Sequence, residues 1–336
     1  MSRSTDPLVS ICIPTRNRAH LVGTAIRSAL EQTYSNLRVI VVDNCSTDGT
    51  VELLEQFRAQ APDRFRYVVN PADLGMQGNF TRCFELAEGK YFKILCSDDR
   101  AYPTLVEKQV AALESHPSAA VATARRRRLS DSLLFRLYDP ILKMRPGLWR
   151  GRDAVRYTFR VSNMIGGSAQ LMMRLDAFRS VGRYRDDPVV GNMFDVEPLL
   201  RLLANGWDLY VSDEVLCDYN SHVSSYTTAT LTDPAIQEYF FAFREEQTRD
   251  PLYAPCLRLP RDFEVSKRNS VLLLLVAGFA ATFPTRDRQR AVRLFDYVIG
   301  HYPALWLRAL RRALEMSYYL PGGRAGQRPI APGIVM

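Results

Sequence analysis

The stretch VSICIPTRNRAHLVGTAIRSALEQTYSNLRVIVVDNCSTDGT, residues 9–50, decides the fold, because it passes from one type of periodicity to another and back. Residues 9–15 form an apolar run rich in β-branched side chains, which predicts a buried strand. Residues 19–32 repeat apolar side chains at helical spacing. Residues 37–43 are again continuously apolar up to Asp43, which predicts a second buried strand.

The alternation continues over the next fifty residues. Residues 46–60 and 78–89 have helical periodicity, and residues 65–71 and 90–97 read as strands. Strands that are apolar on both faces and separated by helices are typical of parallel pairing. We therefore predict an α/β fold with a mostly parallel, Rossmann-like sheet and helices on both faces. Beyond about residue 233 the pattern is helical, which predicts a helical C-terminal extension.

Polar residues follow three of these strands at the point where each strand ends. They are Pro14-Thr15, Asp43-Asn44 and Asp98-Asp99. In open α/β sheets, ligands bind outside the carboxyl ends of the strands. Two adjacent carboxylates at the end of a buried strand repel each other and are costly to desolvate. They indicate either a solvated acidic turn or a cation site for a phosphorylated ligand.

The composition is that of a globular protein with an affinity for anions. Of 336 residues, 47% are hydrophobic and 24% are charged, and the formal net charge is +8. The six cysteines lack metal-site spacing, and the first residues lack a signal-peptide pattern, so we expect free thiols and a cytoplasmic location. The run of arginines at 125–128 fits a solvated face or contact with an anion. No aromatic platform accompanies it, and we expect no nucleic-acid binding.

The motifs above, followed by "SDD" at residues 97–99, resemble the family 2 inverting glycosyltransferases, which have the GT-A fold. The resemblance runs from about Val9 to Asp99 and resumes more weakly over residues 166–225. It implies a GT-A domain over residues 1–232, with a nucleotide-binding half (1–100) and an acceptor half (101–232). The extension from 233 to 336 lies outside it.

The resemblance also implies a metal-assisted reaction at the strand end that carries Asp98 and Asp99. Asp99 corresponds to the family's metal ligand, and Asp98 to the carboxylate that faces the ribose or sugar. His222 matches a family histidine that approaches the metal or the diphosphate. Mg²⁺ or Mn²⁺ is the expected cofactor, because hard cations prefer carboxylate oxygens and leave positions open for phosphate.

The expected nucleotide site lies at the first two strand ends. Asp43 resembles the aspartate that contacts the nucleobase, and Pro14 and Thr15 lie where the family packs the base. Arg16 replaces a frequent tyrosine there, and its guanidinium can still stack on a base. Asn79 could present its side-chain amide to the nucleotide from the start of a helix.

The expected catalytic base is Asp195, which would deprotonate the acceptor hydroxyl. The family usually has a glutamate where Phe194 stands, so the acidic pair is reduced to one residue. Asp195 could instead cap the helix that follows it, because aspartate is favoured at that position. Glu197 falls on a position that is often acidic in the family, and Gly166 and Gly167 resemble the turn beneath the acceptor. These three residues are the expected acceptor contacts.

The predicted donor is a UDP- or dTDP-sugar, and the predicted acceptor is a hydroxyl group on a lipid-linked or small molecule. The basic surplus and an amphipathic C-terminus also fit contact with a membrane surface, and a homodimer is left open. A nucleotidyltransferase and a non-catalytic nucleotide-sugar-binding protein are the alternatives. The former would need a glycine-rich phosphate loop after the first strand, and "PTRNRAH" has no glycine.

Overall fold

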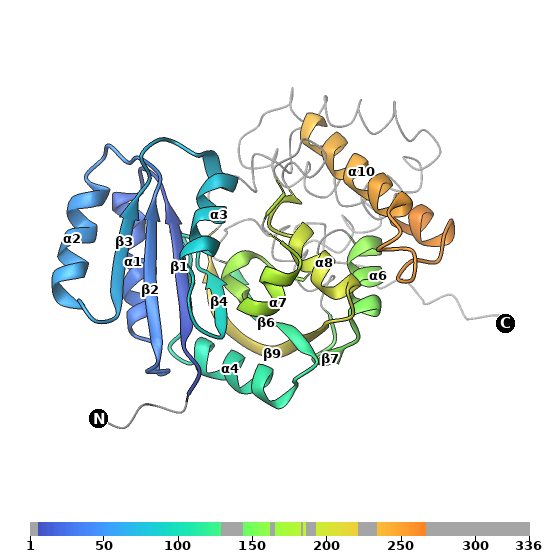
Figure 1. The fold of residues 1–336 in the computed structure, drawn as a ribbon, viewed down its shortest axis with the longest axis horizontal. Coiled ribbons are helices and arrows are strands. Elements are labelled where there is room, and N and C mark those ends of the chain that lie inside the picture. The colour runs from blue at the N-terminus through green and yellow to red at the C-terminus, as the bar shows by residue number, and fades with distance from the viewer. Residues whose placement is uncertain are drawn as a thin grey trace, which may run out of the picture.

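The computed structural model describes residues 6–128, 144–161, 165–182, 184–185, 193–220 and 234–266 (Figure 1). The first hundred residues alternate regularly between strands and helices, as the sequence predicts. Their elements are β1 (Val9–Thr15), α1 (Ala19–Leu30), β2 (Leu37–Asp43), α2 (Thr50–Gln60), β3 (Phe65–Val69), α3 (Gly75–Leu86) and β4 (Tyr91–Ile94).

The second half is less regular and adds short strands and helices. Its elements are β5 (Arg100–Ala101), α4 (Leu105–Ser115), β6 (Ala119–Arg128), β7 (Gly147–Trp149), α6 (Gly151–Val161), the 3₁₀ turn η1 (Ser168–Gln170), β8 (Leu171–Arg174), α7 (Leu175–Ser180), α8 (Glu197–Ala204), β9 (Asp208–Tyr219) and α10 (Pro234–Arg249). Of these, η1, β8 and α7 follow one another without a gap.

All described strands belong to one sheet, in the order β3-β2-β1-β4-β8-β6-β9-β5, with β7 paired to β9. The first four strands pair only in parallel with one another. β8 then runs antiparallel between β4 and β6, and β5 and β7 run antiparallel to β9. The predicted α/β fold is confirmed as a mixed sheet, and its first four strands form the parallel part. That this part binds the nucleotide stays a prediction.

Helices cover both faces of the sheet. Successive residues of a strand point to opposite faces, so a strand buried on both faces contributes side chains to two core clusters. In β1, Ile11 and Ile13 lie in one core cluster, with residues of α1, α2 and α4. Cys12 lies in the other, with residues of α3, α7 and α8. Every residue of β1 is buried, which explains why this strand is apolar without alternation.

The start of the C-terminal extension packs on the acceptor half of the sheet domain. Phe243 of α10 and Tyr253 belong to the same buried cluster as the leucines of α8 (Figure 1). The domain boundary predicted at residue 232 stays a prediction. In the part of the chain that the structure describes, no helix is long and apolar enough to span a membrane.

Candidate active site

The ends of β1 and β2 lie side by side at one edge of the sheet. Thr15 is the register partner of Asp43, and the Asn44 amide donates to the Thr15 carbonyl at 2.9 Å. On the other side of β1, the Leu95 amide donates to the Cys12 carbonyl, so the chain after β4 emerges at the same edge. The three polar strand ends predicted from the sequence therefore meet.

Three buried asparagines hold this edge together. Asn70 donates from its side-chain amide to the side-chain oxygens of Asn44 and Asn79, at 3.0 Å each. Asn79 in turn donates to the main-chain carbonyls of Val42, at 3.1 Å, and Thr15, at 3.4 Å. These contacts tie α3 to the ends of β1 and β2. They show Asn79 as a support for the strand ends, whereas its predicted contact with a nucleotide stays a prediction.

The predicted base-binding residues are anchored by their neighbours. Asp43 is fully buried and accepts hydrogen bonds from the Ser46 amide, at 2.9 Å, and from the Ser46 hydroxyl. Arg16 is half-exposed and pairs with Asp73 at 2.7 Å. The Thr15 hydroxyl is buried and has no hydrogen-bond partner in the described structure, which is the condition expected of a group that meets a ligand.

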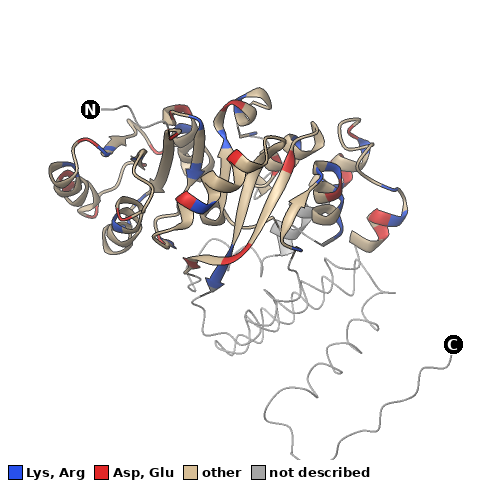
Figure 2. Ribbon diagram, turned by 90° about the horizontal axis from the view of Figure 1, so that it is seen from below, with Lys and Arg blue, Asp and Glu red and all other residues tan. Residues whose placement is uncertain are grey.

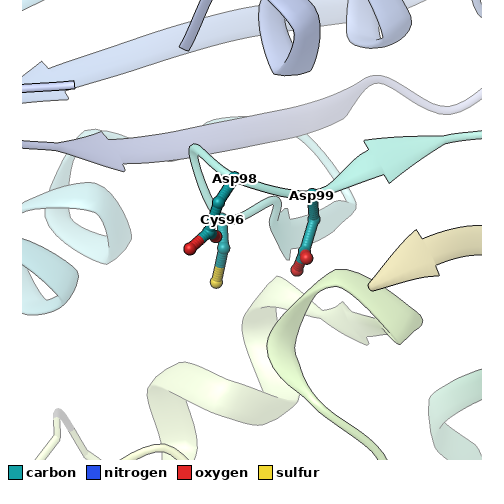
Figure 3. Close-up of side chains that lie close together, drawn as sticks. All are labelled: Cys96, Asp98 and Asp99. Carbon is teal, nitrogen blue, oxygen red and sulfur yellow. The ribbon is translucent and has the colours of Figure 1, made fainter. Parts of the chain in front are cut away.

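The Asp98-Asp99 pair forms the centre of the site. Asp98 accepts a hydrogen bond from the Arg18 guanidinium at 3.1 Å, and buried Asp99 accepts one from the Asn220 amide at 3.1 Å. Figure 3 shows both carboxylates pointing to the same side of the loop as the thiol of Cys96. The ligand atoms of these three side chains lie within 4.8 Å of one another.

The environment of Asp99 fits a divalent cation. Burial, and then the neighbouring charge of Asp98, raise the pKa of Asp99 to about 7. A buried carboxylate with a raised pKa is stabilised in its charged form by a nearby cation, and carboxylate oxygens are the ligands that Mg²⁺ and Mn²⁺ prefer. Asp99 and Asp98 could hold such an ion, with Cys96 at its edge.

A buried lysine lies beneath this centre. Lys93 of β4 is 1% exposed and donates from Nζ to the Ala169 carbonyl at 2.8 Å. Burial lowers the pKa of Lys93 to about 8, while the charges of Cys217, Asp99 and Cys96 oppose that shift. The lysine therefore adds positive charge close to the carboxylate pair.

Asp195, the predicted base, lies in the turn before α8. Val196, and not Asp195, occupies the position at the start of the helix, so the alternative role as a helix cap is not what the structure shows. Burial raises the pKa of Asp195 to about 6, against the main-chain N–H groups of Asp195 and Val196, which lower it. A base with a pKa near neutrality can both accept and release a proton.

Phe194 explains how Asp195 is held. Its ring packs edge-on against Phe80 of α3, with ring centroids 5.1 Å apart, and lies 6.1 Å from Tyr184. The substitution that leaves one acidic residue here therefore supplies an apolar anchor between α3 and α8. Such an anchor fixes the turn that carries Asp195.

Glu197, a predicted acceptor contact, lies in a network of ion pairs. This residue is 0% exposed and pairs with Arg201 at 2.7 Å and with Arg185 at 3.7 Å. Arg185 also pairs with Glu246 of α10 at 2.9 Å. Glu197 thus joins α8 to the C-terminal extension, and its contact with an acceptor stays a prediction.

The two glycines of the predicted acceptor turn lie against β6. Gly166 has a φ of +128°, and a Cβ there would lie 3.0 Å from the Thr123 hydroxyl oxygen. A Cβ on Gly167 would lie 3.2 Å from Nη1 of Arg126. Gly166 therefore needs glycine for its backbone conformation, whereas a side chain at Gly167 would require the end of Arg126 to shift. His222 lies outside the described residues.

The sequence reasoning missed four residues of the site: Arg18, Lys93, Cys96 and Asn220. Lys93 carries a signal, because a single lysine inside an apolar strand implies a buried charge that needs compensation. Arg18 could not be found, since its pairing with Asp98 spans 80 positions of sequence.

These observations define an α/β protein with an acidic cluster at the carboxyl edge of its sheet. Comparison with known proteins agrees. The family model described as "Glycosyl transferase family 2" matches residues 10–180. The chain therefore belongs to glycosyl transferase family 2, and it is a glycosyltransferase.

One relative is the teichuronic acid biosynthesis glycosyltransferase TuaG of Bacillus subtilis (strain 168). It is 26% identical over 242 residues, covering 71% of this chain and 88% of TuaG.

Two solved structures show the same fold. The first is the mannosyltransferase PcManGT from Pyrobaculum calidifontis in complex with GDP-Man and Mn²⁺, with a TM-score of 0.60, 19% identity and coverage of 94% of this chain and 85% of that one. The second is S. aureus TarS 1-349 in complex with UDP-GlcNAc, with a TM-score of 0.50, 12% identity and coverage of 87% and 92%.

Proposed function

We propose that this glycosyltransferase inverts the anomeric centre of its sugar, using a UDP- or dTDP-sugar as donor and a divalent cation. The observation that carries the proposal is the convergence of three carboxylates on Cys96. The charges of Asp99, Asp98 and Asp195 all raise the pKa of this thiol, after burial itself. Asp195 and the carboxylate pair therefore lie within electrostatic reach of the same thiol, although they are almost a hundred residues apart in sequence.

Each half of the site has a distinct task in this proposal. Asp43 and Thr15 contact the base, where a carboxylate can accept a hydrogen bond from a pyrimidine N–H. Asp98 and Asp99 hold the cation, which stabilises the negative charge of the departing diphosphate when it is bound. The complexes of PcManGT with GDP-Man and Mn²⁺ and of TarS with UDP-GlcNAc support this type of ligand.

Asp195 accepts the proton of the acceptor hydroxyl as that oxygen attacks the anomeric carbon. The attack comes from the face opposite the leaving diphosphate, so a single displacement inverts that carbon. A single carboxylate of raised pKa suits this mechanism, which needs one base and no covalent intermediate. Phe194 holds the turn that carries the base, and Gly166 and Gly167 form the turn beneath the acceptor in this proposal.

We propose that the acceptor belongs to a pathway of polysaccharide assembly, because the relative TuaG is named for teichuronic acid biosynthesis. All six cysteines are free thiols, which supports a reducing, cytoplasmic location. The net charge of +8 supports contact with an anionic membrane surface. We also propose that residues 1–232 form the transferase domain.

The test is a screen of sugar nucleotides with Mn²⁺, read as release of nucleoside diphosphate, for the wild type and Asp195→Asn. We expect turnover with one UDP- or dTDP-sugar, and its loss in Asp195→Asn with nearly unchanged nucleotide affinity. The anomeric configuration of the product, read by NMR, decides the stereochemistry. Equal turnover by the two proteins, or a retained configuration, would contradict the proposal.

A further inference from the structure

Arg126 is the second residue of a run of four arginines at the end of β6. Arg125 pairs with Asp213 at 3.1 Å and donates to the Met144 carbonyl. Arg127 makes a two-point contact with Asp218, at 2.8 and 3.1 Å. In Figure 2 the end of β6 that carries this run is blue. The basic run is therefore not a uniform solvated face, as alternate strand residues point to opposite sides.

The register of β6 on β9 brings Arg126 close to the strand that follows Asp99. Arg125 is paired with Val215 and Arg126 with Cys217, so β9 has an extra residue at this step. Such a bulge redirects side chains, and bulges are frequent beside active sites. Cys217 is in turn the partner of Ala101 on β5, two residues after Asp99. The end of β9 reaches Asp99 as well, because the Asn220 amide donates to its carboxylate at 3.1 Å.

Three contacts confirm where the guanidinium lies. Its carbon is 4.3 Å from the ring centre of Tyr219, and Nη1 is 3.2 Å from where a Cβ of Gly167 would stand. The charge of Arg126 also lowers the pKa of Asp99, which places the two groups within electrostatic reach. The half-buried arginine thus lies between the acceptor turn at Gly167 and the predicted metal ligand.

The charges around the reacting region explain what an arginine does there. The described site has three carboxylates, those of Asp98, Asp99 and Asp195. Arg18 is paired with Asp98, and Lys93 is buried and bonded to a main-chain carbonyl. A donor diphosphate brings further negative charge, and the leaving group gains another as the glycosidic bond breaks. The guanidinium, whose carbon is 4.3 Å from the Tyr219 ring centre, has N–H groups in the planar arrangement that suits phosphate and carboxylate oxygens.

We propose that Arg126 binds an anionic oxygen of a substrate beside the metal centre. This inference rests on the proposed function. The oxygen belongs either to the donor diphosphate or to an acidic group of the acceptor, because Arg126 lies between the two. Stacking on Tyr219 sets the direction of the guanidinium, and Gly167 leaves space for it.

The test compares Arg126→Gln, Arg126→Lys and the wild type. Titration calorimetry with UDP, UMP and pyrophosphate, each with Mn²⁺, reads the donor side. For a contact with the diphosphate we expect affinity for UDP and pyrophosphate to fall about tenfold in Arg126→Gln, the usual size of a lost charge-assisted hydrogen bond, with UMP little changed. Arg126→Lys should recover part of the loss. Arg58→Gln, in an exposed pair near the end of α2 that points away from the site, is the control for net charge.

A second measurement separates the two sources of the anion. Hydrolysis of the sugar nucleotide by water needs no acceptor, whereas transfer to a membrane extract does. If the anion belongs to the acceptor, UDP affinity and hydrolysis stay unchanged in Arg126→Gln and transfer falls about tenfold or more. The inference is wrong if Arg126→Gln is folded by circular dichroism and matches the wild type in UDP affinity, pyrophosphate affinity, hydrolysis and transfer. If the wild type itself binds no UDP, dTDP or pyrophosphate with Mn²⁺, the proposed function fails, and this inference with it.

Discussion

Replacing Asp99 with asparagine is expected to stabilise the metal-free protein and to abolish its function. The pKa of Asp99 rises from 3.8 to about 7 on folding, chiefly because the group is buried. The folded chain therefore holds a proton that the unfolded chain releases between these two values, and the free energy of unfolding falls as pH rises through this window. A shift of this size corresponds to about 4 kcal/mol at pH 8, and to less than half of that at pH 5.

Asparagine has the same shape and can still accept from the Asn220 amide, but it carries no charge to desolvate. Urea unfolding in EDTA, at pH 5 and at pH 8, measures the difference between the two proteins. We expect Asp99→Asn to be more stable than the wild type at both values, with a gain that is larger at pH 8 by about 2–3 kcal/mol.

Adding Mn²⁺ should then raise the stability of the wild type and leave Asp99→Asn unchanged, because binding to the folded state alone is stabilising. Asp98→Asn is the matched control. It removes the neighbouring charge, which is the second cause of the shift, and should recover only part of the gain. A stability difference that does not vary with pH, or a less stable Asp99→Asn at pH 8, would refute this account of the carboxylate.

Three further predictions concern the acceptor half. The rate of transfer should rise with pH through about 6 and then level, since Asp195 acts as the carboxylate; a rate–pH profile without a limb near this value would remove Asp195 from the mechanism. Phe194→Ala should lower the free energy of unfolding by about 3–5 kcal/mol and reduce kcat more than nucleotide affinity, because it empties the space between Phe80 and Tyr184; an equal loss in Phe57→Ala with full kcat is the expected control. Glu197→Gln should lower the free energy of unfolding in urea by about 3–5 kcal/mol, since it leaves Arg201 and Arg185 without their buried charged partner; a change below 1 kcal/mol would contradict this structural role of Glu197.

Much of the fold could be predicted from periodicity, because the strands of the first half are buried on both faces and the helices are not. The edge where Thr15, Asp43 and Asp99 meet follows from the parallel pairing of β1, β2 and β4 alone. The short antiparallel strands β5 and β7 could not be foreseen. β5 and β7 are two and three residues long, too short for any periodic pattern.

The candidate site residues at strand ends could be proposed from the sequence. The residues that reach the site through long-range contacts could not. Glu197 is a predicted acceptor contact because its position is often acidic in the family. Its burial depends on Arg185 and on Glu246 of α10, which the local sequence does not reveal. The orientation of Arg126 depends on one extra residue in β9, which a run of arginines cannot show.

The central claim is that Asp98 and Asp99 hold a divalent cation that binds the diphosphate of a sugar nucleotide. The most direct test is titration of the wild type with UDP and with dTDP, in the presence of Mn²⁺ and in the presence of EDTA, and of Asp99→Ala under the same conditions. We expect tight binding of one of them by the wild type only with Mn²⁺, and weak binding by Asp99→Ala in both conditions. Equal affinity with and without Mn²⁺, or equal affinity in the two proteins, would contradict the claim.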